Sequence, residues 1–295
     1  MESSRCKAFL ASAEYGSFTK AAEHLHYTPS GVSQLVAALE DELGFVLFLR
    51  AKRGVTLTDA GERLLPAIRS FLAEEQRIDE IAAGINGLTL GEIRIASLSS
   101  ISTHWLPRLI RLFRQDFPDI RIRLLEGVRG EVVDWLSERK ADIGFLNFFE
   151  DLSAYHWIPL AKDRMLAILP KSHPLAQSKR YPVRRCSGEE FIMPSMGWDE
   201  DIIALFEKFG IEPDIRYTTA ENYATIAMVE NEMGMSIMNE LITLSFQADV
   251  VKLPLNPPQI IEMGMALPSL TQASPAVRKF VEYAERHLKK LATVT

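Results

Sequence analysis

The chain has 295 residues, of which 47% are hydrophobic and 24% are charged. This balance is typical of globular proteins with two or three domains. No apolar run approaches the ~20 residues of a membrane span, and the N-terminus lacks the pattern of an export signal. Cys6 and Cys186 are the only cysteines, which argues against a disulfide framework. We therefore expect a cytoplasmic protein without a membrane segment.

The net charge of −6 argues mildly against a nucleic-acid partner. Residues 1–58 do not change this, because they contain six basic and six acidic side chains. A DNA-binding function would therefore depend on where the charges lie, above all on the basic cluster between Arg50 and Arg53.

Residues 1–58 predict three short helices followed by a hairpin. Apolar residues at helical spacing predict a first helix over residues 3–14. Ser17 is a good N-cap for the second helix. Thr28 can cap the third, with Pro29 at its first position, where a missing N–H costs nothing. A helical hairpin buried in a core would show similar spacing.

The β-prone runs in residues 45–58 favour DNA binding over such a core hairpin. They predict a wing with a basic tip beside a helix that fits the major groove. On that helix the outward side chains are short, or carry an amide that can reach base edges. The candidate DNA-binding residues are Ser17, Thr28, Pro29, Ser30, Ser33, Gln34, Arg50, Lys52 and Arg53.

Residues 59–87 predict one long helix that Thr58 caps and that ends near Ile85, with a hinge at residues 84–87. Apolar residues recur there every three or four positions, as in a coiled-coil seam. The seam positions are Leu57, Gly61, Leu64, Ile68, Phe71, Glu75, Ile78, Ala82 and Ile85. Its length favours pairing with a second subunit over packing on its own domain.

Residues 88–295 change to alternating strands and helices. The order β-α-β-α-β, found twice, predicts parallel strands covered by helices and arranged in two α/β lobes. We expect the chain to cross between the lobes near residues 148–160 and to return near residues 257–265. A final amphipathic helix is predicted over residues 274–291.

Ligands in such folds bind at the carboxyl ends of the strands. Three of these ends are rich in polar side chains, at Ser99 to Ser102, Asn147 and Ser195. Hydroxyls at a helix start are more often caps than ligand contacts, but three such ends facing one cleft would favour a ligand. Arg129, after the second strand, could pair with a carboxylate, although an arginine at such a position is more often solvated.

The N-terminal segment resembles the winged helix-turn-helix of LysR-type transcriptional regulators. The matching residues are Gly16-Ser17-Phe18, Ala21-Ala22, Leu25, Val32-Ser33, Leu39-Glu40, Leu43-Gly44, Leu47-Phe48, Arg50, Leu57-Thr58 and Ala60-Gly61. One departure is Pro29-Ser30-Gly31, where the family often has Gln-Pro-Ala. Gly31 costs about 1 kcal/mol of helix stability relative to Ala.

The resemblance implies that the long helix pairs two subunits and that the rest is an effector domain similar to periplasmic binding proteins. It implies effector positions at Ser99, Ile101, Ser102, Asn147, Ser195 and Met196, and the residue pattern adds Ser100 and Arg129 to the candidate site. Thr219, Glu221 and Asn222 are weaker candidates. The expected domains are residues 1–58 for DNA binding, 59–87 for dimerisation and 88–295 for the effector.

The sequence contains no GxGxxG, GxxxxGK[ST], HExxH or GxSxG motif, and its six histidines show no metal-like spacing. We therefore expect no cofactor, no metal and no enzyme activity. The leading hypothesis is a regulator that binds palindromic double-stranded DNA as a homodimer or tetramer. Its effector would be a carboxylate or another small anion. The alternatives are an α/β enzyme with an accessory DNA-binding module and an architectural DNA binder without a ligand.

Overall fold

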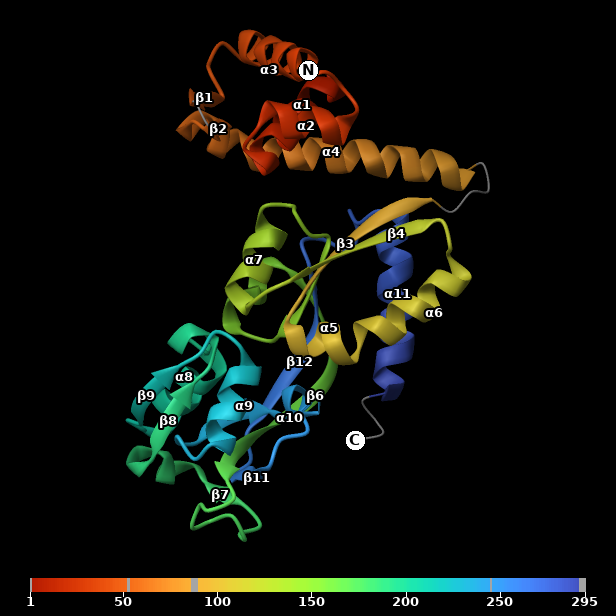
Figure 1. Ribbon diagram of the computed structural model, residues 1–295. Helices are drawn as coiled ribbons and strands as arrows, with labels where there is room; N and C mark the ends of the chain where they lie inside the picture. Colours follow the sequence, from red (N-terminus) through yellow and green to blue (C-terminus); the bar gives the residue numbers. More distant parts are fainter. Residues whose placement is uncertain (1, 52–53, 86–89, 245, 292–295) are drawn as a thin grey trace.

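The computed structural model describes residues 2–51, 54–85, 90–244 and 246–291. Its N-terminal part is a small domain of three helices and a two-stranded hairpin, drawn in red and orange in Figure 1. The elements are α1 (Ser3–Tyr15), α2 (Phe18–Leu25), α3 (Pro29–Leu43), β1 (Phe48–Ala51) and β2 (Gly54–Leu57). The predicted winged helix-turn-helix is therefore the observed fold.

The helix boundaries follow the predicted caps. The Ser17 hydroxyl accepts a hydrogen bond of 3.4 Å from the Lys20 N–H, and the Thr28 hydroxyl accepts one of 3.1 Å from the Gly31 N–H. Gly44 ends α3 in the left-handed region with φ of 81°. The buried apolar core of this domain includes Phe9, Ala21, Ala22, Val32, Val36, Leu39 and Leu47.

The hairpin is fixed beside α2 by main-chain contacts. The Val55 N–H donates to the Gly16 carbonyl at 2.9 Å. A Cβ at Gly54, whose φ is +139°, would collide with that carbonyl, so the close approach requires glycine. At the other side the Glu40 carboxylate accepts the Leu47 N–H at 2.6 Å. These contacts hold β1 and β2 in one position relative to the helices.

Helix α4 (Asp59–Ile85) follows directly, capped by the Thr58 hydroxyl, which accepts the Gly61 N–H at 3.1 Å. The first half of the predicted seam does not face outward. Ile68 is buried in the core of the N-terminal domain, and Leu64 and Phe71 pack against it. The exposed apolar side chains lie in the second half, at Ile78, Ile81 and Ile85. The coiled-coil prediction thus needs correction for the front of the helix.

The remaining residues form two lobes that share one eight-stranded sheet, and Figure 1 shows the helices that cover it. In the first lobe β3 pairs in parallel with both β4 and β5, and β12 runs antiparallel to β5. Its elements are β3 (Gly91–Ser97), α5 (Ser99–His104), α6 (Leu106–Asp116), β4 (Ile120–Glu126), α7 (Arg129–Ser137), β5 (Ile143–Asn147) and α11 (Pro275–Leu291).

The second lobe is built on the far half of the same sheet. Strand β6 pairs there with β10 and β11, and β8 pairs with β9 in a separate small sheet. Its elements are β7 (Tyr181–Pro182), β8 (Glu190–Met193), α8 (Glu200–Phe209), β9 (Asp214–Thr218), α9 (Asn222–Glu230), β10 (Ser236–Asn239), α10 (Glu240–Thr243) and β11 (Val250–Asn256). Two 3-10 turns lie among these elements, at Val183–Gly188 and Ser195–Gly197, and another, Glu150–Ala154, follows β5 and packs on the first lobe.

Two long strands connect the lobes where the sequence predicted crossing segments. They are β6 (His156–Pro170) and β12 (Ile260–Leu267). The segment between β3 and β4 contains two helices, α5 and α6, which meet at Trp105. Pro107 lies in the first turn of α6 and is compatible with a helix start there.

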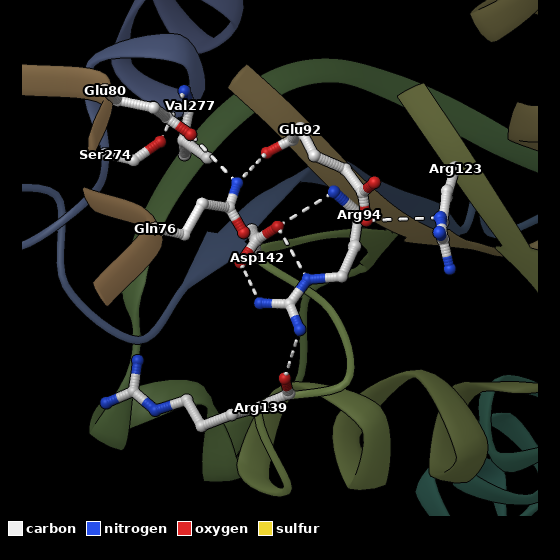
Figure 2. A network of polar contacts seen from close by, with 9 residues as sticks. All are labelled: Gln76, Glu80, Glu92, Arg94, Arg123, Arg139, Asp142, Ser274 and Val277. Atoms are coloured by element: carbon white, nitrogen blue, oxygen red, sulfur yellow. Dashed lines mark hydrogen bonds and ion pairs between the residues drawn. The ribbon is translucent and has the colours of Figure 1, made fainter. Parts of the chain in front are cut away.

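Helix α4 contacts the first lobe through polar groups. In Figure 2 the Gln76 amide donates to the Glu80 carboxylate at 2.9 Å and to the Glu92 carbonyl at 3.1 Å. Glu80 is buried and accepts the Ala276 N–H of α11 at 3.2 Å. A Cβ at Gly91 would clash with Glu80 and Ala276, so the strand start must be glycine for this approach.

A second contact ties α4 to α7. The buried Arg69 side chain lies 3.1 Å from the Glu138 carboxylate, and it also donates to the Glu138 carbonyl at 3.3 Å. Behind this contact, Arg94 and Asp142 form a pair with an N–O distance of 2.6 Å, also drawn in Figure 2. The linker helix is therefore in direct contact with the first lobe through Arg69, Gln76 and Glu80.

Among the described residues, no helix has both the length and the apolar character that crossing a bilayer requires. Both cysteines are buried and unpaired by disulfides.

Candidate functional site

Helix α3 presents a polar face to solvent. Ser30 and Gln34 are exposed and Ser33 is half-buried, whereas Val32 and Val36 on the opposite face are fully buried. Thr28 and Ser30 lie at the start of the helix with their hydroxyls 3.2 Å apart. A helix with short polar side chains on one outer face can enter a major groove and reach base edges.

The hairpin places one described basic side chain beside this helix-turn-helix. The Arg50 guanidinium lies 5.3 Å from the centre of the Phe18 ring. Lys52 and Arg53, the rest of the predicted basic tip, lie outside the described residues. Nearby acidic groups are engaged in the fold: Glu40 holds the hairpin backbone and Glu42 pairs with Arg5 at 2.9 Å.

Ser17 has a structural role at the end of the turn. Its hydroxyl oxygen caps α2, and the residue is half-buried. The other predicted DNA-binding residues among those described, from Thr28 to Gln34 and Arg50, lie on the outer surface of α3 and the hairpin. This placement is compatible with their predicted role, which remains a prediction.

A cleft of about 270 Å³ lies between the two lobes. The first lobe contributes the start of α5, the end of β4, the start of α7 and the end of β5. The second lobe contributes the starts of α8 and α9 and part of β10. The apolar lining residues include Met165, Ile202, Ile237, Met238, Ile242 and Ile261.

Most of the predicted effector residues meet in this cleft although they come from distant parts of the sequence. Six of them line it: Ser99, Ser100, Arg129, Asn147, Ser195 and Met196. The weaker candidates Glu221 and Asn222 also line it, whereas Thr219 instead pairs its hydroxyl with Thr225. Ser195 and Met196 adopt left-handed φ of 54° and 57°, an uncommon conformation for side-chain-bearing residues.

Ile101 and Ser102 require correction, because neither lines the cleft. Ile101 is fully buried in the core of the first lobe, and its N–H donates to the Leu98 carbonyl at 3.1 Å. The Ser102 side chain is buried and forms a short hydrogen bond with the Glu126 carboxylate. The period of α5 turns these two positions inward and leaves Ser99 and Ser100 facing the cleft.

Arg129 and Asn147 of the first lobe contact one carboxylate of the second. The Arg129 guanidinium lies 2.5 Å from one oxygen of Asp201, and its side chain is only 11% exposed. The Asn147 amide donates to the other Asp201 oxygen at 2.7 Å. The predicted solvated or ligand-binding Arg129 is thus already paired across the cleft. Phe149 lies beside it, with its ring centre 5.5 Å from the guanidinium.

The cleft contains more carboxylates than the sequence reasoning identified. Arg129 is the one basic side chain among the described lining residues. Six carboxylates line the cleft: Glu126, Glu131, Asp199, Glu200, Asp201 and Glu221. A signal was available in the run Asp199-Glu200-Asp201, although three acidic residues at a helix start are also typical of an ordinary first helical turn. The charge of this lining does not favour the predicted anionic effector.

Asp199 has an unusual environment within this group. Burial, with a further contribution from the charge of Asp201, raises the pKa of Asp199 to about 6. Its carboxylate caps α8 by accepting the Ile202 N–H at 3.1 Å. The described residues contain no group of three or more side chains that could hold a metal ion.

Comparisons with known proteins agree with both halves of this architecture. Residues 4–62 match the bacterial regulatory helix-turn-helix of the lysR family, and residues 86–289 match the LysR substrate binding domain. An uncharacterised HTH-type transcriptional regulator of Bacillus subtilis, YvbU, is 33% identical over 97% of this chain and 98% of its own.

Two solved structures share the fold. Full-length OxyR C199D from Pseudomonas aeruginosa superposes with a TM-score of 0.76 at 21% identity, over 98% of both chains. The effector-binding domain of QuiR in complex with shikimate has a TM-score of 0.62 at 24% identity, covering 68% of this chain and 99% of that one. The family matches extend over almost the whole sequence, from the helix-turn-helix to the two-lobed domain. This chain therefore belongs to the LysR family of DNA-binding transcriptional regulators, which are not enzymes.

Proposed function

We propose that residues 1–58 read DNA, residues 59–87 join two subunits and residues 88–295 bind the effector that sets the regulatory output. The observation that carries this proposal is the single helix α4, which contacts both the reading domain and the first lobe, the lobe that forms one side of the cleft. A ligand that changes the position of one lobe relative to the other can act on α4 through these contacts. The protein would act in the cytoplasm, where its DNA is.

The proposed DNA contacts follow from the outer surface of α3. Ser33 and Gln34 read base edges, while Thr28, Ser30 and Arg50 contact the backbone or the adjacent minor groove, together with Lys52 and Arg53. Ser17 contributes indirectly, because its hydroxyl caps α2, the helix that precedes α3. Palindromic DNA is the expected target, because a two-fold dimer presents two such helices to two half-sites.

The proposed dimer interface is supported by the exposed apolar side chains of α4. Ile78 is 64% exposed, Ile81 is 41% exposed and Ile85 is 81% exposed. Burying an isoleucine side chain is worth about 1.5–3 kcal/mol, so pairing these positions with a second α4 would be favourable. A tetramer formed from two such dimers is the arrangement in which lobe movement changes the spacing of the DNA-bound pairs.

The proposed effector is a small molecule held between the lobes. The QuiR effector domain, a neighbour in fold, binds shikimate, and here the corresponding architecture has a cleft with polar and apolar walls. A carboxylate or other small anion would have to displace Asp201 from Arg129 and Asn147 before it could use their donors. An anionic effector is therefore one of two candidate classes, and binding measurements with charged probes can distinguish them.

The DNA-reading half of the proposal can be tested by selecting binding sequences from random double-stranded DNA with the full-length protein. We expect an inverted repeat. Gln34→Ala should relax the preference at one or two positions of each half-site, a loss of about 1–3 kcal/mol of discrimination. Arg50→Ala is the matched control, because losing a backbone contact should weaken all sequences alike and flatten the salt dependence. Equal behaviour of the two variants would contradict the assignment.

A further inference from the structure

The cleft between the lobes has a charge that points to the chemistry of its ligand. This inference rests on the proposed function, in which the cleft holds the effector. Six carboxylate side chains surround it, three of them consecutive at the start of α8, and among the described lining residues they face a single guanidinium. The N-terminus of α8 cannot neutralise the three negative charges, since its partial positive charge is about half an elementary charge.

The one basic group is not available to an incoming anion. The Arg129 side chain is only 11% exposed, and its guanidinium is held at 2.5 Å from Asp201. Asn147 donates its amide hydrogen to the same carboxylate. Removing one partner from such a part-buried pair is costly, because the remaining charge is left without compensation. An anionic ligand would pay this cost in addition to repulsion from the other carboxylates.

A second, independent observation indicates a missing donor. Asn147 is 6% exposed and lines the cleft, and its carbonyl oxygen Oδ1 has no hydrogen-bond partner in the described structure. The orientation of this amide is fixed by Asp201, since the reversed amide would place two acceptors against each other. A buried acceptor without a donor costs about 1–3 kcal/mol. A ligand that brings N–H groups would satisfy it, whereas a carboxylate cannot.

The lining of the cleft also has an apolar part. Met165, Ile237 and Ile261 belong to it. Glu200 and Glu221 lie at the starts of α8 and α9 on the second-lobe side, opposite Glu126 and Glu131 of the first lobe. A ligand that complements this arrangement has a cationic group for the carboxylates and a short hydrocarbon part for the apolar wall.

We propose that the effector of this regulator is a small organic cation, an aliphatic amine or guanidine whose N–H groups bind the carboxylates of α8 and α9 and the Asn147 carbonyl. The ligand bridges the lobes through these groups. It leaves the Arg129–Asp201 pair in place and adds to it. An anionic effector would instead have to replace that pair.

The test is calorimetric titration of the full-length protein without DNA, because diamines also bind phosphates. The probes have matched carbon skeletons: 1,4-diaminobutane, its guanidino derivative agmatine, uncharged 1,4-butanediol and anionic succinate. We expect at least one of the two cationic probes to bind at millimolar concentration or below, with no binding of succinate. Glu200→Gln and Glu221→Gln should each weaken cation binding about two- to fivefold, the range for part-exposed ion pairs. Glu282→Gln, an exposed carboxylate on α11 outside the cleft, should leave it unchanged.

Asp201→Asn provides the opposing arm. It removes the carboxylate from Arg129, so succinate should bind this variant more tightly than it binds the wild type. Succinate binding to the wild-type cleft with an affinity equal to that of the cations would overturn the inference, as would failure of both cations to bind. Selection of binding sequences from random DNA with the same preparation tests the proposed DNA-reading function separately. That selection does not depend on the ligand, so a wrong ligand class and a failed DNA-reading function give different results.

Discussion

Asp199→Asn is predicted to make the protein more stable at neutral and alkaline pH. Asp199 is the residue before α8, and its carboxylate accepts the Ile202 N–H at 3.1 Å. Asparagine is an equally good N-cap, so the substitution keeps this hydrogen bond and removes only the charge. The charge is unfavourable where it lies, because burial and the nearby Asp201 raise the pKa of Asp199 from 3.8 to about 6.

The size of the effect follows from proton linkage. Between pH 4 and about 6 the folded protein holds a proton on Asp199 that the unfolded chain has released, so the free energy of unfolding falls as pH rises through this window. Above pH 6 the full penalty is present, and raising a pKa from 3.8 to about 6 is equivalent to about 3 kcal/mol. Asparagine does not titrate. We therefore expect Asp199→Asn to be more stable by about 3 kcal/mol at pH 8 and by about half of that at pH 5.

Urea unfolding followed by tryptophan fluorescence measures this difference. All four tryptophans lie between residues 105 and 198, within the effector domain, so the signal reports the domain that contains Asp199. Glu200→Gln, one residue further along the same turn, is the matched control and should change stability by no more than about 0.5 kcal/mol. A variant that is less stable than the wild type at pH 8, or a stability difference independent of pH, would refute the reasoning.

Three further predictions follow from contacts of the N-terminal half. Ser33→Ala, like Gln34→Ala, should alter base preference without changing the salt dependence of binding, as measured by gel shift on selected and random DNA. Ile78→Glu combined with Ile85→Glu should convert dimer to monomer in sedimentation experiments, because each isoleucine contributes about 1.5–3 kcal/mol on burial; unchanged association would exclude α4 as the interface. Arg69→Met should release α4 from α7 and expose it to limited proteolysis, with a loss of about 1–3 kcal/mol, since Glu138 is part-exposed. Glu74→Gln on the exposed side of α4 should leave proteolysis unchanged.

Local chemistry made the elements predictable. Thr28 and Pro29 begin α3 and Gly44 ends it, because capping and left-handed glycine act within a few residues. Strand β4 (Ile120–Glu126) likewise coincides with the β-prone run IRIRLLE. The paired lobes followed from the repeated alternation of strands and helices.

The missed features depend on contacts between distant segments. Arg129 and Asp201 are 72 positions apart in the sequence, and no periodicity predicts that a guanidinium at one helix start will face a carboxylate at another. The prediction that the front of the α4 seam faces a second subunit was wrong for a related reason. Leu64 and Ile68 have the spacing of a seam whether they pack on a partner or on their own domain.

The sequence also did not predict that the cleft is lined by carboxylates. Asp199, Glu200 and Asp201 form an ordinary first turn of a helix when considered alone. They become part of a ligand site only when the fold brings Glu126 and Glu131 to the opposite wall. The same fold buries Ile101 in the core of the first lobe. The sequence did not reveal this, because the side that each residue of α5 faces depends on where the helix begins.

The central claim is that a ligand bound between the lobes changes how the protein holds its DNA. Footprinting and DNA bending by the full-length protein on its selected site, with and without saturating agmatine, test it most directly. The Glu200→Gln and Glu221→Gln double variant at the same concentration controls for agmatine bound to DNA. The account predicts a changed footprint and bend angle for the wild type and a smaller change for the variant. An unchanged footprint and bend angle, with calorimetry showing the cleft filled, would contradict it.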